Sequence, residues 1–282
     1  MRILIGYNDS DGAKAALYDL GRAGFPEETE ALVLTVVESL PHLEAVAEAN
    51  SIVQGAKSAL LQNFPTWKVK AETASGSPAG EILARADSFD PDVIVVGEPR
   101  HVFPRGGRFL ARTSHAVLAE AKCSVRIARG IENRLTRAER LLIGFDGSAG
   151  AVHAVDVIAK RSWPAGTAVR LLAVADSSVL SSIGRFTPQM NDAAIEERFA
   201  SQWAEALAAA SLEKLRFAGL LASVEVRFGH PGEIIVREAE YWNAYTIFVG
   251  PHCAPNAIGR LSIGSVSSCV ASSASSTVEV VR

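Results

Sequence analysis

The sequence predicts an α/β protein that contains the same fold twice, each time as a parallel sheet with helices on both faces. Short apolar runs alternate with helical patterns along the chain, which is typical of parallel strands joined by crossover helices. The order of these segments then repeats. The landmarks near the ends of the two repeats lie 153 residues apart in each case: Gly97 and Gly250, Gly106 and Gly259, Ala111 and Gly264.

Length and composition favour two globular domains. The 282 residues suffice for two cores, and 48% hydrophobic with 21% charged residues is typical of folded protein. The net charge of −3 gives no general attraction to nucleic acid or to an anionic membrane, so we expect neither as a partner. The three cysteines form no CxxC pair, and no apolar run approaches the ~18 residues of a membrane span. We expect a soluble, cytoplasmic protein without a metal site.

Each half opens on a short buried strand, a glycine, a polar turn and a helix. The strands are 3–5 and 141–143, and Ser10 or Asp11 in the first half and Ser148 in the second can cap the helix that follows. In the helix that follows Ser148, apolar spacing predicts three residues that face the core: Val152, Val155 and Ile158.

A second buried strand follows at 32–37 and 169–174, and after it a long helical region. In the second half, helical spacing predicts an inward face made of Ile195, Phe199, Trp203, Ala206 and Ala210. The third strands, 67–73 and 224–228, alternate apolar with charged residues. We therefore expect them at the edges of the sheet, with one face in water.

Both halves close in the same way. A Gly-x-Pro turn begins a helix, a core strand ends in glycine, and a loop and a helix lead into a final strand. The core strands are 93–96 and 246–249, and the final strands are 124–127 and 277–280. Because the segment between the halves is charged and poor in apolar residues, we divide the chain into domain 1–130, linker 131–140 and domain 141–282.

Three motifs give the chain its resemblance to a known family: the opening 143–148 (Ile-Gly-Phe-Asp-Gly-Ser), the Gly-x-Pro-x-Glu helix, and Gly250 followed by 264–267 (Gly-Ser-Val-Ser). With them the chain resembles the universal stress proteins, in the tandem form with two domains. The resemblance implies Rossmann-like domains of the adenine nucleotide alpha hydrolase type, each with a five-stranded parallel sheet. It also implies ATP, with or without Mg²⁺, between the ends of strands one and four, which is the switch point where open α/β sheets bind ligands.

Carried over residue by residue, the resemblance places a nucleotide site in the second domain. Its members are Gly144, Phe145, Asp146, Val174, Val249, Gly250, His252, Cys253, Gly264, Ser265, Val266 and Ser267. A helix opening after Gly264 would present free N–H groups to a phosphate, and Ser265 and Ser267 would add hydroxyl donors. The resemblance assigns Asp146 to the ribose or the adenine edge, and Cys253 stands where the family has a second glycine.

Each of these residues also has an interpretation without a ligand. Asp146 could be a turn aspartate, and Gly264 with Ser265 could simply begin a helix. Val174 and Val249 would be core residues in either case, and His252 could be a solvated loop residue. The spacing from Gly259 to Gly264 lacks the lysine of a Walker P-loop. We nominate no catalytic residue and expect at most a weak ATPase.

The first half has lost the diagnostic residues. Asn8 replaces the aspartate, and Ala111-Arg112 replaces Gly-Ser, so a Cβ and a bulky side chain crowd the helix start. We expect no ATP binding of the family kind here. The nearby loop carries a basic set that could bind another anion or simply be solvated: Arg100, His101, Arg105, Arg108 and Arg112.

The resemblance therefore implies an ATP-binding, regulatory stress-response protein. A non-nucleotide interaction module of the same fold, with protein partners, stays open as the alternative, and a carrier of an apolar ligand is a third. The resemblance also implies that the two halves pair through their last strands as an intramolecular pseudo-dimer. A further homodimer is left open.

Overall fold

The computed structural model describes residues 1–38, 43–98, 110–129, 138–175, 193–251 and 263–282. The N-terminal half contains β1 (Arg2–Gly6), α1 (Asp11–Leu20), β2 (Glu30–Val37), α2 (Leu43–Asn63), β3 (Lys68–Ser75), α3 (Pro78–Phe89), β4 (Val93–Gly97), α4 (Arg112–Glu120) and β5 (Ser124–Ala128). The C-terminal half contains β6 (Arg140–Gly144), α5 (Ala149–Ala159), β7 (Ala168–Ala175), α7 (Ala193–Phe217), β8 (Leu221–Phe228), α8 (Pro231–Tyr241), β9 (Thr246–Val249), α9 (Ser265–Ser273) and β10 (Thr277–Val280).

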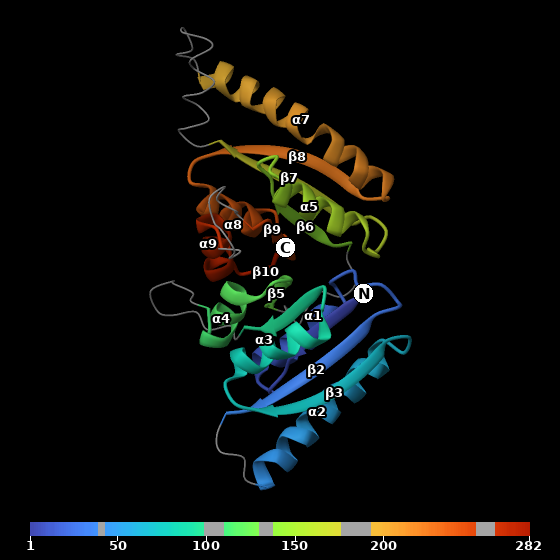
Figure 1. Cartoon of the computed structure of the whole chain (residues 1–282). Coiled ribbons are helices and arrows are strands. Elements are labelled where there is room, and N and C mark those ends of the chain that lie inside the picture. The colour runs from blue at the N-terminus through green and yellow to red at the C-terminus, as the bar shows by residue number, and fades with distance from the viewer. Residues whose placement is uncertain (39–42, 99–109, 130–137, 176–192, 252–262) are drawn as a thin grey trace.

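The strands form one continuous sheet in the order β3-β2-β1-β4-β5-β10-β9-β6-β7-β8. Within each half all pairings are parallel, which confirms the prediction of a five-stranded parallel sheet in each repeat. The two halves meet where β5 pairs antiparallel with β10. Figure 1 shows the halves one above the other, with α2 and α7 at the outer ends. The edge positions of β3 and β8 agree with their alternating sequences.

Helices cover both faces of the sheet, as predicted. On one face, a single apolar cluster runs through both halves and includes Ile82 of α3, Leu118 of α4, Ile235 of α8 and Val270 of α9. On the other face, α1 and α2 enclose a separate core in the N-terminal half, and α5 and α7 enclose another in the C-terminal half. Among the described helices, none combines the length and apolar character that crossing a bilayer requires.

The turn after the first strand is built alike in both halves. The Ser10 hydroxyl accepts from the Ala13 N–H and caps α1, and Ser148 caps α5 in the same way. Immediately before each cap the backbone enters the left-handed region, at Asp9 with φ 59° and at Gly147 with φ 74°. The Gly147 turn also lies against Leu207 of α7, and a Cβ there would come within 2.5 Å of the leucine Cδ1.

The buried faces of two helices differ from those predicted. On α7, the buried residues include Ala200, Ala204 and Ala208, whereas Phe199 is 44% exposed. The predicted face is therefore wrong: Trp203 is half-buried, and Ala206 and Ala210 are exposed. The buried row is offset from it by one or two positions and continues into Leu212 and Leu215. On α5, Val155 and Ile158 are buried as expected, but Val152 is 39% exposed at the start of the helix. The side chain of Ile195 lies outside the part that the structure describes.

A buried network of charged side chains crosses the junction between the halves. Arg126 on β5 donates to the Asp19 carboxylate from Nε at 2.5 Å, and to Glu279 Oε2 on β10 from Nη1 at 2.9 Å. The Arg161 guanidinium donates to both oxygens of Glu279, and the Tyr245 hydroxyl donates to Asp19. Burial alone would raise the pKa of Glu279, but Arg161 and Arg126 outweigh it and lower that pKa. The network is therefore charged and internally paired.

Candidate functional site

A cavity of about 290 Å³ lies at the carboxyl ends of the central strands in the C-terminal half. This is close to the lower end of the size range of small-molecule pockets. It sits where the strand order reverses between β6 and β9, at the switch point of the half-sheet. The structure brings eight of the twelve predicted residues to its wall: Gly144, Phe145, Asp146, Val174, Val249, Gly250, Val266 and Ser267.

The cavity combines an apolar interior with very few polar side chains. Among the described residues that line it, Asp146 alone carries a formal charge. Its Oδ1 accepts from the Ser148 N–H at 2.9 Å, so the carboxylate is also a turn aspartate, as the alternative interpretation held. The residue is exposed. For its second oxygen, Oδ2, the described residues show no hydrogen bond, and this is the oxygen that a ligand could use.

In this structure the Ser267 hydroxyl binds a backbone carbonyl, whereas the sequence predicted it as a donor to phosphate. Its hydroxyl donates to the Gly250 carbonyl at 2.7 Å, and the side chain is almost fully buried. A hydroxyl has one proton, so in this arrangement Ser267 cannot also donate to a phosphate. It instead links α9 to the end of β9 and helps to shape the cavity wall.

Gly250 is needed for packing whether or not a ligand binds. A Cβ at this position would lie 2.6 Å from the carbonyl carbon of Gly150, in the first turn of α5. Gly97, its counterpart in the N-terminal half, is still more constrained, since a Cβ there would lie 1.9 Å from the Gly12 carbonyl oxygen. The same glycine is thus kept in the half that has lost the nucleotide motif. Close approach of strand and helix explains both residues.

Gly264 and Ala111 begin equivalent helices with nearly the same backbone. Gly264 has φ −68° and ψ 157°, and Ala111 has φ −59° and ψ 152°. Glycine is therefore not demanded by conformation at the start of α9, and what it provides is the space that a Cβ would fill. Gly264 and Ser265 stand at the N-terminus of α9, next to Val266, which lines the cavity.

In the N-terminal half a side chain of the protein occupies the helix start. The Glu98 carboxylate is buried and accepts from the Ala111 N–H, at 3.0 Å through Oε1 and at 3.3 Å through Oε2. The equivalent residue in the C-terminal half is Pro251, which has no charge. An internal anion thus takes the donor that a phosphate would use. This contact adds a reason, beyond the crowding by Ala111 and Arg112, to expect no family-type nucleotide site here.

Six further residues line the cavity that sequence reasoning did not include: Ser148, Ala151, Leu172, Pro231, Ile235 and Pro251. Two signals could have found some of them. Leu172 is two residues before Val174 and so shares its face of β7. Pro231 and Ile235 belong to the Gly-x-Pro helix that was noted. His252 and Cys253 lie outside the described residues, as do Gly106, Gly259 and the basic residues of 99–109.

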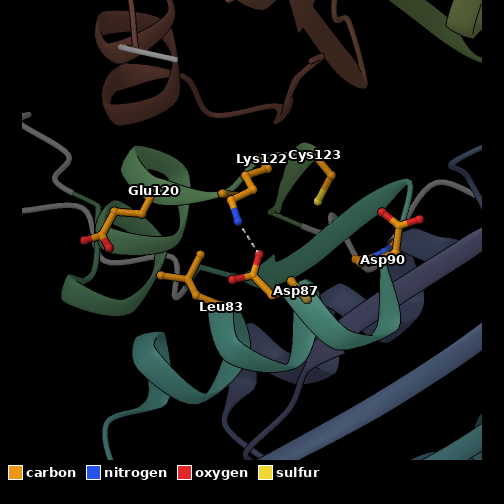
Figure 2. A pocket seen from close by; sticks show the side chains of 9 residues that line it. Leu83, Asp87, Asp90, Glu120, Lys122 and Cys123 are labelled. Carbon is orange, nitrogen blue, oxygen red and sulfur yellow. Dashed lines mark hydrogen bonds and ion pairs between the residues drawn. The ribbon is translucent and has the colours of Figure 1, made fainter. Parts of the chain in front are cut away.

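A second cavity, of about 540 Å³, lies between the end of α3 and the start of β5 (Figure 2). Asp87, Asp90 and Glu120 border it, and Lys122 pairs with Asp87 at 2.7 Å. Burial raises the pKa of the Cys123 thiol to about 11, so this cysteine is a poor nucleophile at neutral pH. Across the described part of the chain, no group of three or more His, Cys, Asp or Glu is arranged to hold a metal ion.

Fold and site together define an α/β protein with two doubly wound halves and a ligand-sized cavity at one switch point. The model of the Universal stress protein family matches residues 1–129 and 138–282, and the chain therefore belongs to that family. No curated protein matches the chain.

Two solved structures share the whole fold. A universal stress protein from Archaeoglobus fulgidus DSM 4304 is 19% identical, with a TM-score of 0.69 and coverage of 100% of this chain and 98% of that one. A functionally unknown protein from Pseudomonas aeruginosa PAO1 is 17% identical, with a TM-score of 0.64 and coverage of 99% and 92%. At these identities the likeness establishes the arrangement of both halves.

Proposed function

We propose that the C-terminal half binds an adenine nucleotide, ATP, and that the protein acts as a regulatory stress-response factor. The observation that carries the proposal is the cavity at the switch point between β6 and β9, where eight residues of the predicted site converge. Membership of the universal stress protein family agrees with it. The N-terminal half, with Glu98 on its helix start, serves as the structural partner.

The residues present fit the three parts of a nucleotide. Leu172, Val174 and Ile235 offer apolar surface for a base. Asp146 Oδ2, which has no partner among the described residues, can accept from a ribose hydroxyl. Phosphates would lie at the N-terminus of α9, where N–H groups without partners inside the helix and the helix dipole favour an anion. Asp146 is the one carboxylate among the described lining residues, so a Mg²⁺ ion on the nucleotide would have a single protein carboxylate within the described wall.

The alternative, an interaction module that binds no nucleotide, is favoured by one set of contacts. The Ser267 hydroxyl and one oxygen of Asp146 already have partners within the protein. Gly250 is required for packing. These residues would therefore be the same in a protein that used only the fold. The two functions differ in a property that can be measured directly, the uptake of ATP.

We expect Gly264→Val to weaken ATP binding at least ~10-fold, because the valine side chain fills the space through which a phosphate reaches the α9 N–H groups. Calorimetric titration of the purified protein with ATP measures this. The backbone at 264 is extended and accepts valine, so the fold should survive, which circular dichroism checks.

Ala111→Val is the matched control, at the equivalent helix start of the other half. It should leave ATP binding unchanged. Release of nucleotide on denaturation of the purified protein is an independent check. Absence of both bound nucleotide and heat at millimolar ATP would rule out the proposed function and favour the interaction module.

A further inference from the structure

The junction between the halves is built about a pseudo-two-fold axis. Residues 125–127 of β5 pair antiparallel with residues 278–280 of β10, and Arg126 stands opposite Glu279. Arg126 and Glu279 are themselves equivalent positions, 153 residues apart. The axis therefore passes through this one pair. Any pairing of two identical halves in the same register would place each of these residues opposite itself.

Part of the junction obeys this symmetry closely. The Arg129 backbone N–H donates to the Thr277 hydroxyl at 3.1 Å, and the Arg282 backbone N–H donates to the Ser124 hydroxyl at 3.1 Å. The guanidinium groups of these two arginines also donate hydrogen bonds to backbone carbonyl oxygens of the opposite half. Arg129 donates to Ala271 and Ser276, and Arg282 donates to the equivalent residues Leu118 and Cys123. These two arginine clamps, with the valines and isoleucine beside the axis, could form just as well between two copies of one half.

The centre of the junction breaks the symmetry. Arg126 and Glu279 have opposite charges, they are fully buried, and the Arg126 Nη1 donates to Glu279 Oε2 at 2.9 Å. In a pairing of two N-terminal halves, Arg126 would face a second Arg126. In a pairing of two C-terminal halves, Glu279 would face a second Glu279. Asp19 would still pair with each arginine and Arg161 with each glutamate, but both alternatives lose the Arg126–Glu279 contact and place like charges face to face away from water, which is unfavourable.

A second contact at the junction also requires one N-terminal and one C-terminal half. Asp19 on α1 accepts from the Tyr245 hydroxyl at 2.8 Å and from the Thr277 hydroxyl at 2.8 Å, both across the junction. The residue equivalent to Tyr245 in the N-terminal half is Asp92. If two N-terminal halves paired, Asp19 would meet a carboxylate at the position of its tyrosine donor. This contact, which belongs to the same network as Arg126–Glu279, also favours the pairing of unlike halves.

We propose that Arg126–Glu279, supported by Asp19–Tyr245, is the element that selects which halves pair. The arginine clamps and the apolar residues hold β5 against β10 and set the register. The central charges then permit only an N-terminal half against a C-terminal half, within one chain or in reciprocal exchange between two. The partner that fits this surface is the unlike half of the protein, and pairing with a like half of a second copy is rejected.

The test uses two full-length chains with reversed charges at the axis. The first carries Arg126→Glu with Asp19→Asn and the second Glu279→Arg with Arg161→Gln, because the Asp19 carboxylate and the Arg161 guanidinium would otherwise repel the introduced side chains. Two glutamates then meet at the axis of the first chain, and two arginines at the axis of the second. Each chain alone should lose the internal β5–β10 contact, with an earlier elution volume in size-exclusion chromatography and a lower Tm than the unmodified protein.

Mixing or co-expressing the two chains should restore the pairing. The glutamate introduced at position 126 of one chain then meets the arginine introduced at position 279 of the other, and the unmodified pair forms at the second junction. We expect a 1:1 heterodimer with Tm restored toward that of the unmodified protein.

Glutamine variants serve as controls, because they show whether Arg126 and Glu279 select the pairing half or only stabilise the junction. Arg126→Gln and Glu279→Gln remove a charge without creating a like pair, so each should stay a closed monomer and gain nothing from mixing. Arg129→Gln and Arg282→Gln alter the symmetric clamps, and mixing these two chains should give no heterodimer. The proposal is overturned if the charge-reversed chains elute and melt like the unmodified protein. It is also overturned if their co-expression yields no heterodimer while the glutamine variants fold.

Discussion

Gly97→Ala is expected to destabilise the protein by about 3 kcal/mol, because the new methyl group has no space. Its Cβ would lie 1.9 Å from the Gly12 carbonyl oxygen and 2.8 Å from the Ala13 backbone nitrogen. These are backbone atoms in the first turn of α1, so relief requires α1 to move away from β4. Chemical denaturation with urea measures the loss as a change in the free energy of unfolding.

Two matched glycine variants show whether close approach is the cause. Gly55 lies in the middle of α2, and a Cβ there meets nothing within 4 Å. Gly55→Ala should therefore stabilise the protein, by about 0.5–1 kcal/mol. Gly250→Ala should destabilise it, but less than Gly97→Ala, since its nearest backbone contact is at 2.6 Å. Equal stability of Gly97→Ala and Gly55→Ala would contradict this account of the strand-helix contact.

Asp19→Ala is expected to cost about 3–5 kcal/mol of stability, because the fully buried Arg126 loses one of its two carboxylate partners and two hydroxyl groups lose their acceptor. Asp19 accepts four hydrogen bonds, from Arg126 Nε and Nη2, the Tyr245 hydroxyl and the Thr277 hydroxyl. Alanine removes all four acceptor contacts at once in a region that excludes water. The free energy of unfolding from urea denaturation gives the size of the effect.

The control for Asp19→Ala is an ion pair on the surface of the same half. Lys122 and Asp87 are 2.7 Å apart, with side chains that are 79% and 62% exposed. Lys122→Ala should change stability by no more than about 0.5 kcal/mol, since water and salt screen the pair. If Asp19→Ala costs no more than Lys122→Ala, the junction network contributes little to stability and the buried pairing is not what holds the halves together.

Much of the fold could be read from local patterns. Buried parallel strands are near-continuous apolar runs, and the edge strands β3 and β8 show alternation because one face is wet. Both serine caps were visible because a hydroxyl before a helix satisfies a free N–H. The failure on α7 has a physical reason. The predicted face starts from the bulky Phe199 and Trp203, whereas the buried row starts with Ala200, Ala204 and Ala208, whose low hydrophobicity gives a weak signal.

The candidate site could be predicted in its location but not in its hydrogen bonds. Asp146, Val249 and Gly250 follow strand ends that topology brings together, so sequence order and the switch-point rule suffice to collect them. Which atom the Ser267 hydroxyl donates to depends on the distance between α9 and β9, and that is not encoded in any short motif. The role of Gly250 likewise depends on where α5 lies.

The two repeated halves, the order of strands and helices, and the difference in motif between the halves follow from local patterns and from equivalent positions along the chain. Three features emerge only when the chain is folded: the Glu98 carboxylate accepts from the Ala111 N–H, Gly97 and Gly250 allow close packing, and Arg126 meets Glu279 at the axis. Each of these depends on side chains from segments far apart in sequence, whose contact is fixed by close packing in three dimensions.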